Sequence, residues 1–298
     1  MGAYKRAVTR ILVAVLALNL LVALAKAWAG LESGSLALVG DALASGVDAG
    51  SNVVALVVIH YATRPADRDH PYGHRKFETL AAFVLSGLLF VTAFEVAREA
   101  IRRLVAGETL VEPTAVTFAV AAGTLVVNLA VAAYERRAGE RLQSQLLKAD
   151  AMHTFSDVFV TVGVLGSLAL AAAGFGAADA IVSLGVAGFI AWTGFGVFRE
   201  VAPVLTDRAP FEAERIAEIV RAVPGVASVH DIKSRGHPQE AFIQMHLVVE
   251  PRDLDEAHAV TEAVERALER ELGAKEVVVH VEPDEDAPLA PGAGDEAR

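Results

Sequence analysis

The sequence predicts a polytopic α-helical membrane protein, with six transmembrane helices followed by a small α/β cytoplasmic domain. Apolar residues make up 54% of the 298 residues and the mean hydropathy is +0.43, more than a soluble domain of this size usually buries in one core. Six stretches have the roughly 20 residues needed to cross the hydrocarbon. After Asp207 the pattern changes to short amphipathic helices and alternating strands.

The six transmembrane helices are each expected to follow an apolar run. Their predicted ranges are 8–30, 35–62, 78–104, 113–134, 148–174 and 178–202. The first run follows Lys5, Arg6 and Arg10, as the apolar part of a secretory signal would. It is longer than that part usually is and has no convincing small-residue cleavage site, so we interpret it as the first transmembrane helix.

Basic residues predict the orientation in the membrane. Most Lys and Arg residues of the connections lie in the N-terminal tail and in the loops at 64–76 and 136–148, whereas the opposite side holds Arg98, Arg102 and Arg103. By the positive-inside rule, we expect a multi-pass protein of the cell membrane with both termini in the cytoplasm.

The soluble part is predicted to be a two-layer domain of αββαβ order. Its helices are expected at 211–223 and 254–272, and its strands at 227–235, 240–250 and 276–282. The chain thus divides into a transmembrane domain at 1–207, a cytoplasmic metal-binding domain at 208–283, and an acidic tail at 284–298 that is predicted to be disordered.

Composition limits the chemistry that is open to this chain. Cysteine is absent, so any metal must be held by His, Asp or Glu. The net charge of −11 argues against binding nucleic acid. No Gly-rich phosphate loop, nucleophile elbow or HExxH motif is present, so we do not expect an enzyme.

Five ionisable residues interrupt the second and fifth apolar runs, where each costs several kcal/mol unless it is paired, hydrated or metal-bound. They are Asp41, Asp48, Asp150, His153 and Asp157. The segments 41–48 and 150–157 share the pattern D-A-x-x-[S/T]-x-x-D. Such weak internal repeats are typical of transporters, whose substrate site forms where corresponding helices meet.

Spacing within these helices predicts a metal site. His153 and Asp157 are four residues apart and share a helix face, and Asp48 supplies a third ligand if the second helix packs on the fifth. One nitrogen and two carboxylates suit zinc and tolerate iron, manganese, cobalt or cadmium. A buried hydrogen-bond network without metal is the alternative. We assign Asp41 and Asp150 to helix capping or a hydrated vestibule.

The loop after the second helix holds Asp67, His70 and His74 within eight residues. These residues, in a turn shaped by Pro71 and Gly73, can enclose a small cation. On spacing alone, a solvated polar loop explains them equally well.

These segments resemble the cation diffusion facilitator family over nearly the whole chain. The resemblance is carried by GDALASGVDAGSN, RPADRDHPYGHRKFETLAA, ADAMHTFSD, LTDRAP, VHDIKSR, FIQMHL, EAH and VVVHVEP. It implies a homodimeric, proton-coupled metal exporter with six transmembrane helices and a metallochaperone-like cytoplasmic domain.

The resemblance also implies which residues bind metal. The transport site falls on Asp48, His153 and Asp157, and its fourth position is Ala44 here, so that water, Ser45 or Asn52 would complete the shell and iron or manganese could replace zinc. The loop site falls on Asp67, His70 and His74, and Lys76 and Asp207 match a pair that links the helices to the soluble domain. The cytoplasmic metal cluster falls on His230, His246, His258, His280 and Glu282.

The predicted function is proton-coupled efflux of divalent transition-metal cations from the cytoplasm, with zinc as the first expectation. The expected partners are metal ions, protons, the lipid bilayer and a second copy of the chain. Two alternatives stay open from the residues: a membrane-anchored metal sensor without transport, and a proton-linked carrier of a small organic substrate.

Overall fold

The computed structural model describes residues 2–33, 36–106, 115–172, 178–238, 240–250 and 253–283. The tail predicted to be disordered at 284–298 lies outside the described residues. The chain forms two compact units, Met1–Ala202 and Pro203–Arg298, and each is considered by itself below.

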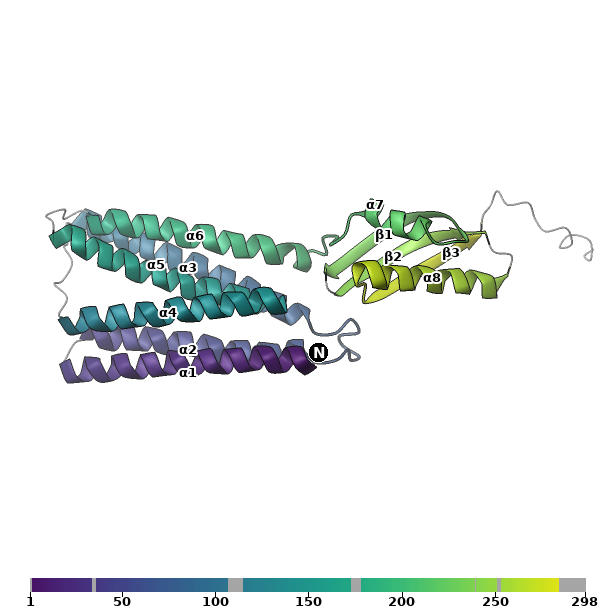
Figure 1. Ribbon diagram of the computed structural model, residues 1–298. Helices are drawn as coiled ribbons and strands as arrows, with labels where there is room; N and C mark the ends of the chain where they lie inside the picture. Colours follow the sequence, from purple (N-terminus) through teal and green to yellow (C-terminus); the bar gives the residue numbers. More distant parts are fainter. Residues whose placement is uncertain are drawn as a thin grey trace, which may run out of the picture. The chain divides into compact units, whose positions relative to one another are not determined.

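The first unit is built from six long helices that lie side by side (Figure 1). They are α1 (Gly2–Ser33), α2 (Leu36–Ala62), α3 (Lys76–Ala106), α4 (Ala115–Leu142), α5 (Gln145–Ala172) and α6 (Ala178–Leu205). The predicted helical membrane architecture is thereby confirmed. The largest difference is at the end of α4, which was expected at residue 134, because Arg and Glu are good helix formers and continue the helix past the apolar run.

The surface of this unit is apolar, as a lipid-facing surface must be. Leu24, Trp28, Phe94 and Trp192 each expose 67% or more of their surface. Within the described residues, three segments meet both the length and the hydropathy needed to cross a membrane, and these are Gly2–Trp28, Lys76–Ala106 and Ile181–Leu205.

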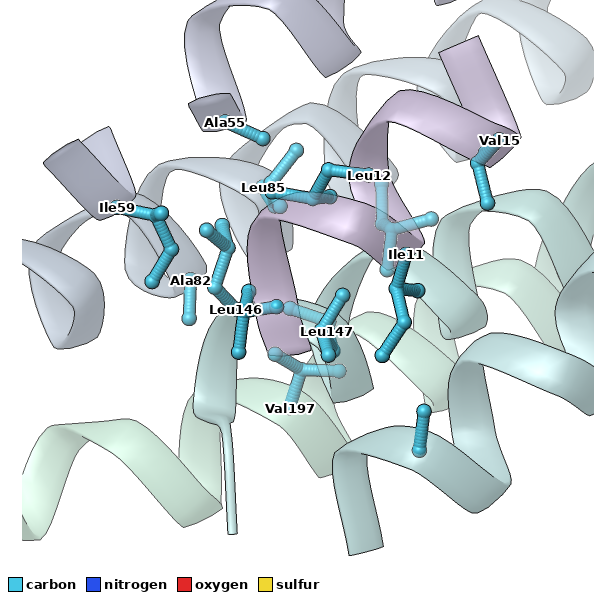
Figure 2. Packing of buried hydrophobic residues seen from close by; sticks show 14 of the residues in the cluster. Ile11, Leu12, Val15, Ala55, Ile59, Ala82, Leu85, Leu146, Leu147 and Val197 are labelled. Atoms are coloured by element: carbon cyan, nitrogen blue, oxygen red, sulfur yellow. The ribbon is translucent and has the colours of Figure 1, made fainter. Parts of the chain in front are cut away.

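Buried apolar side chains gather at one end of the bundle, the end at which α1, α3 and α5 begin and α2, α4 and α6 finish. Figure 2 shows side chains of several helices converging there. The cluster includes Ile11, Leu12, Ile59, Leu85, Leu146, Leu147 and Val197. Within the described residues, the closest helix pairs of the unit are α1 with α2 and α4 with α5, and α2 and α5 are not among the closely packed pairs.

A buried carboxylate joins three helices at the same end. The Tyr4 hydroxyl donates to both carboxylate oxygens of Glu78, at 2.9 and 2.7 Å, and the Ser144 hydroxyl donates to Glu78 Oε1. The backbone N–H of Leu146, in the first turn of α5, also donates to that oxygen at 3.3 Å. A negative charge at a helix N-terminus is favourable, so Glu78 fixes the start of α5 against α1 and α3.

The second unit is an αββαβ domain, as predicted. It contains α7 (Ala213–Arg221), β1 (Val226–His237), β2 (Glu240–Val249), α8 (Leu254–Leu272) and β3 (Glu276–Pro283). The sheet order is β1-β2-β3, with β1 antiparallel and β3 parallel to β2, and α8 forms the crossover that a parallel pair requires (Figure 1).

Both helices of the second unit pack on one face of its sheet. Ile216 of α7, Leu268 of α8 and Met245 of β2 belong to one buried cluster. Because side chains alternate along a strand, His246 next to Met245 points to the opposite face. Asp253 caps α8 by accepting the Glu256 N–H at 2.8 Å, and Gly273 ends that helix in the left-handed conformation, with φ of 65°.

Candidate metal sites

Asp48, His153 and Asp157 converge inside the helix bundle. Each offers one ligand atom, and these atoms lie within 4.8 Å of one another. His153 Nε2 is 3.8 Å from Asp48 Oδ1. An ion bound at about 2.1 Å to each of two atoms spans up to about 4.2 Å, so this pair is already at bridging separation. The three side chains can therefore enclose one small cation with little movement.

The three residues face a small polar cavity between α1, α2, α4 and α5 of about 20 Å³. Its lining is Asn19, Val22, Ser45, Asp48, Ser51, Asn52, Asn128, Asp150, His153, Thr154 and Asp157. A cavity needs roughly 10–15 Å³ to hold one water, so this one admits an occupant the size of a water or an ion. Side chains of both α2 and α5 line this space, and Asn52 of α2 contacts Asp150 of α5 beside it.

Hydrogen bonds around the cavity hold its lining in place. The Asn52 amide donates to Asp150 Oδ2 at 3.2 Å, and its oxygen accepts from the Asn19 amide at 2.8 Å. The Ser45 hydroxyl accepts from Lys26 Nζ at 2.9 Å, and Lys26 is 5% exposed. Ser45 and Asn52, the two side chains that could complete a metal shell, are thus already engaged by other partners.

The structure decides between the two roles expected for Asp150 only in part. Helix capping does not fit, because Asp150 lies inside α5, five residues after its first residue, and only 3% of its surface is exposed. It lines the same cavity as the three predicted ligands. A role in a hydrated vestibule stays a prediction. Asp41 lies in α2, but its side chain is outside the described part, as is that of Ala44.

The sequence interpretation missed Glu135, which is fully buried on α4. It lies seven residues after Asn128, another cavity residue, and residues seven apart share a helix face. That spacing was the available signal. It was overlooked because the fourth transmembrane helix was expected to end at residue 134. Lys26 was missed as well, although it is a lone charge in an apolar run.

The predicted loop residues also come together. Asp67 accepts the backbone N–H of His70 at 2.8 Å, and its other oxygen is 3.2 Å from His74 Nε2. His74 is 4% exposed and its Nδ1 donates to the Pro65 carbonyl at 3.1 Å. In neutral His74 the Nε2 lone pair then faces a carboxylate oxygen, an arrangement that a cation between them stabilises. The His70 hydrogen bond, with help from both histidine charges, holds the pKa of Asp67 below its ordinary value.

Strand register aligns the histidines of the second unit. His230 pairs with His246, and His246 pairs with His280, so the three lie side by side across β1, β2 and β3. Glu282 lies 2.9 Å from His230 Nε2 and 2.8 Å from His246 Nδ1. Hydrogen bonds from His246 and then His230 lower the pKa of Glu282. A bulge after His230, where Asp231 has a φ of 51°, bends β1 at this point.

His258 is placed apart from this group. It lies on α8, 71% of its side chain is exposed, and its described partner is Glu262, at 3.5 Å. Among the described residues of the second unit, the ligand atoms that converge are those of His230, His246 and Glu282. The participation of His258 stays a prediction, and so does the pairing of Lys76 with Asp207, since those two residues belong to different units.

Comparison with known proteins adds the family context. The family model described as the cation efflux transmembrane domain matches residues 12–206, and the model of the cation efflux protein cytoplasmic domain matches residues 209–284. The cation-efflux pump FieF of Escherichia fergusonii is 33% identical over 283 residues, and FieF of Shigella boydii is 32% identical over the same length, with 94% of each chain covered. The solved structure of MamM CTD in its copper form is 28% identical, covers 26% of this chain and 87% of its own, and has a TM-score of 0.23.

Proposed function

The chain belongs to the cation diffusion facilitator family of cation-efflux proteins, and on that premise we propose that it exports divalent transition-metal cations from the cytoplasm in exchange for protons. The observation that carries the proposal is the convergence of Asp48, His153 and Asp157 on one polar cavity within the bundle. A membrane anchor has no need for three ionisable groups at that depth, because each is costly there.

Metal ions and protons compete for the same ligand atoms, and this competition couples metal transport to proton transport. His153 must be neutral and both carboxylates ionised to bind a cation, so metal entry displaces protons and protonation expels metal. The ion approaches from the cytoplasm, the helices then reorient, and protons from the opposite side release it. The neutral metal complex of two carboxylates and one imidazole also avoids carrying net charge through the lipid.

The ligand set favours zinc but does not restrict the cargo to it. One imidazole and two carboxylates suit zinc, and alanine at position 44 leaves a position that a water can fill. More oxygen and water ligation suits manganese and iron better than a closed four-ligand shell does. We therefore place zinc first and include iron and manganese as cargo of the same site.

The two other groups of residues are proposed to act on the cytoplasmic side. Asp67, His70 and His74 form a loop site close to the entry of the path. The cluster of His230, His246, His280 and Glu282 binds metal in the cytoplasmic domain, through which two chains associate. A ligand shifts a conformational equilibrium only through its differential affinity, so metal bound there favours the conformation in which the domains are closest.

Zinc flux into proteoliposomes tests the central assignment. We expect His153→Ala and Asp157→Ala to lower the initial rate by roughly tenfold or more, as is typical when metal contacts are lost. His60→Ala is the matched control, because His60 lies at the far end of α2 beside Lys5 and should transport like wild type. Wild-type flux in the His153 and Asp157 variants would overturn the assignment. Metal binding without any zinc flux in wild type would instead support the alternative function, a membrane-anchored metal sensor.

A further inference from the structure

Glu135 is a buried carboxyl group that the proposed metal site does not use. It projects from α4, and none of its surface is exposed. Its Oε2 accepts a hydrogen bond from the Thr154 hydroxyl at 3.4 Å, whereas its Oε1 has no donor among the described residues. A buried carboxylate oxygen without a donor is expensive, so a proton on this group is the simplest way to satisfy it.

Asp150 is the neighbour that can share such a proton. The Glu135 and Asp150 side chains are within hydrogen-bonding reach of one another, although two ionised carboxylates cannot hydrogen-bond. Asp150 is itself buried, and within the described residues it accepts a hydrogen bond from Asn52. The charged groups that act on Asp150 are His153 on the same helix, α5, and Asp48 on α2.

Two buried carboxyl groups in contact do not both ionise, because the second charge would face the first in a medium that screens it poorly. They hold one proton between them and titrate as a pair. The pair then has a single negative charge, with the carboxylic acid of one residue donating to the carboxylate of the other.

The pair also borders the cavity of the proposed metal site. Asp150 lines that cavity together with Asp48, His153 and Asp157, and Thr154, the partner of Glu135, lines it too. A divalent cation in the cavity adds positive charge beside Asp150 and so favours the ionised form of the pair.

We propose that Glu135 and Asp150 form a proton-binding site distinct from the metal ligands, which holds one shared proton and releases it when a divalent cation occupies the cavity. In this step the carboxyl O–H bond breaks and solvent water outside the cavity takes the proton, with no electron transfer. The pair changes from one negative charge to two as the cation arrives. The inference rests on the proposed function in one respect, that the cation binds at Asp48, His153 and Asp157.

Infrared difference spectroscopy of the full-length protein in lipid, with and without zinc at neutral pH, tests the proposal. A protonated carboxyl group has a carbonyl band that shifts in deuterated water. We expect wild type to show this band without zinc and to lose it when zinc is added. In Glu135→Gln and Asp150→Asn, the addition of zinc should not cause this loss of the carboxyl band. Glu140→Gln, an exposed residue of the same helix paired with Arg136, should show it in full.

Proton release gives the second measurement. Titration with zinc in a weakly buffered solution should release about one proton fewer per chain from Glu135→Gln than from wild type or Glu140→Gln. If Glu135→Gln does not fold, the infrared spectrum of wild type with and without zinc decides whether the proposal holds.

Two results would overturn the proposal: no protonated carboxyl band in zinc-free wild type, or a band that zinc leaves unchanged while His153→Ala abolishes zinc flux. In both cases the metal site would stand and only the proton pair would fail. Normal flux in His153→Ala would mark failure of the proposed function itself.

Discussion

Position 44 decides how many protein ligands the membrane site can offer. It lies four residues before Asp48, which is about one turn of helix, so a ligand at 44 would lie on the same face of α2 as Asp48. Alanine has no ligand atom, and the neighbouring polar side chains Ser45 and Asn52 are hydrogen-bonded elsewhere. If a cation binds as proposed, its ligands are these three protein residues and solvent.

Ala44→Asp should change metal preference. A fourth protein ligand favours a closed tetrahedral shell, so we expect zinc and cadmium to gain over manganese and iron, by roughly tenfold in the ratio of their transport rates. Competition transport assays across zinc, iron, manganese, cobalt and cadmium measure this ratio. Ala44→Ser serves as the control because it adds no charge. An unchanged ranking in the aspartate variant would mean that position 44 does not set selectivity.

The residues of the metal site were largely predictable, because charged groups in an apolar helix are conspicuous in the sequence alone. Asp48, His153 and Asp157 were identified from spacing and resemblance, and the structure brings them together. Glu135 could not be recognised as buried without the length of α4. The environment of Asp150 depends on Asn52, which lies 98 residues away along the chain, and such a contact is not encoded in local periodicity.

At the scale of the helices, the anchoring of α5 links stability to function. This helix carries His153 and Asp157, and its first turn is fixed by Glu78, which Tyr4 and Ser144 also contact. The apolar cluster of Figure 2 surrounds the same end of the bundle. The first turn of α5 is therefore held by hydrogen bonds and close packing, while the residues farther along the helix border the polar cavity.

Tyr4→Phe removes one donor from this junction while it keeps the ring. Glu78 is 3% exposed, and a buried carboxylate that loses a hydrogen bond costs about 1–3 kcal/mol, so the melting temperature in detergent should fall. Thermal unfolding with and without zinc measures the change. Tyr61→Phe is the matched control, since Tyr61 is 43% exposed on α2 and should melt like wild type. Equal melting of both variants would show that the Glu78 junction contributes no stability.

Element order was predicted better than element ends. The αββαβ order followed from alternation, and the strand limits agree within two residues. α4 runs eight residues further than expected because Glu135, Arg136 and Arg137 were interpreted as a loop from their charge, whereas they have good helix propensity. The alignment of His230, His246 and His280 needed the strand pairing, which sequence spacing does not determine.

At the scale of the whole molecule, the cytoplasmic domain presents its proposed metal ligands on the sheet face that the helices leave uncovered. His230, His246 and Glu282 supply three ligand atoms, and a tetrahedral ion has room for one more. An incomplete shell on an uncovered face is suited to an ion that a second chain also contacts. Metal binding and association of two chains are then one linked equilibrium.

Association should therefore depend on both zinc and pH. Protons compete with zinc for the ring nitrogens of histidine ligands, so acidification from pH 7.5 to about 5.5 should remove zinc. Glu282 behaves differently, because its pKa is lowered by His246 and His230. Its contribution to stability is complete above the unfolded value of about 4.3 and is lost only as pH falls through the lower folded value. We therefore attribute a loss of zinc between pH 7.5 and about 5.5 to proton competition at the histidines, and not to protonation of Glu282.

Sedimentation of the full-length protein in detergent measures this dependence. We expect zinc to lower the dissociation constant of the dimer roughly tenfold at pH 7.5, and this effect to vanish near pH 5.5 while the domain stays folded. His246→Ala should lose most of the zinc effect. His237→Ala, on the same strand as His230 but outside the cluster, should keep it. A zinc effect that persists in His246→Ala, or that is equal at the two pH values, would show that this cluster does not control association.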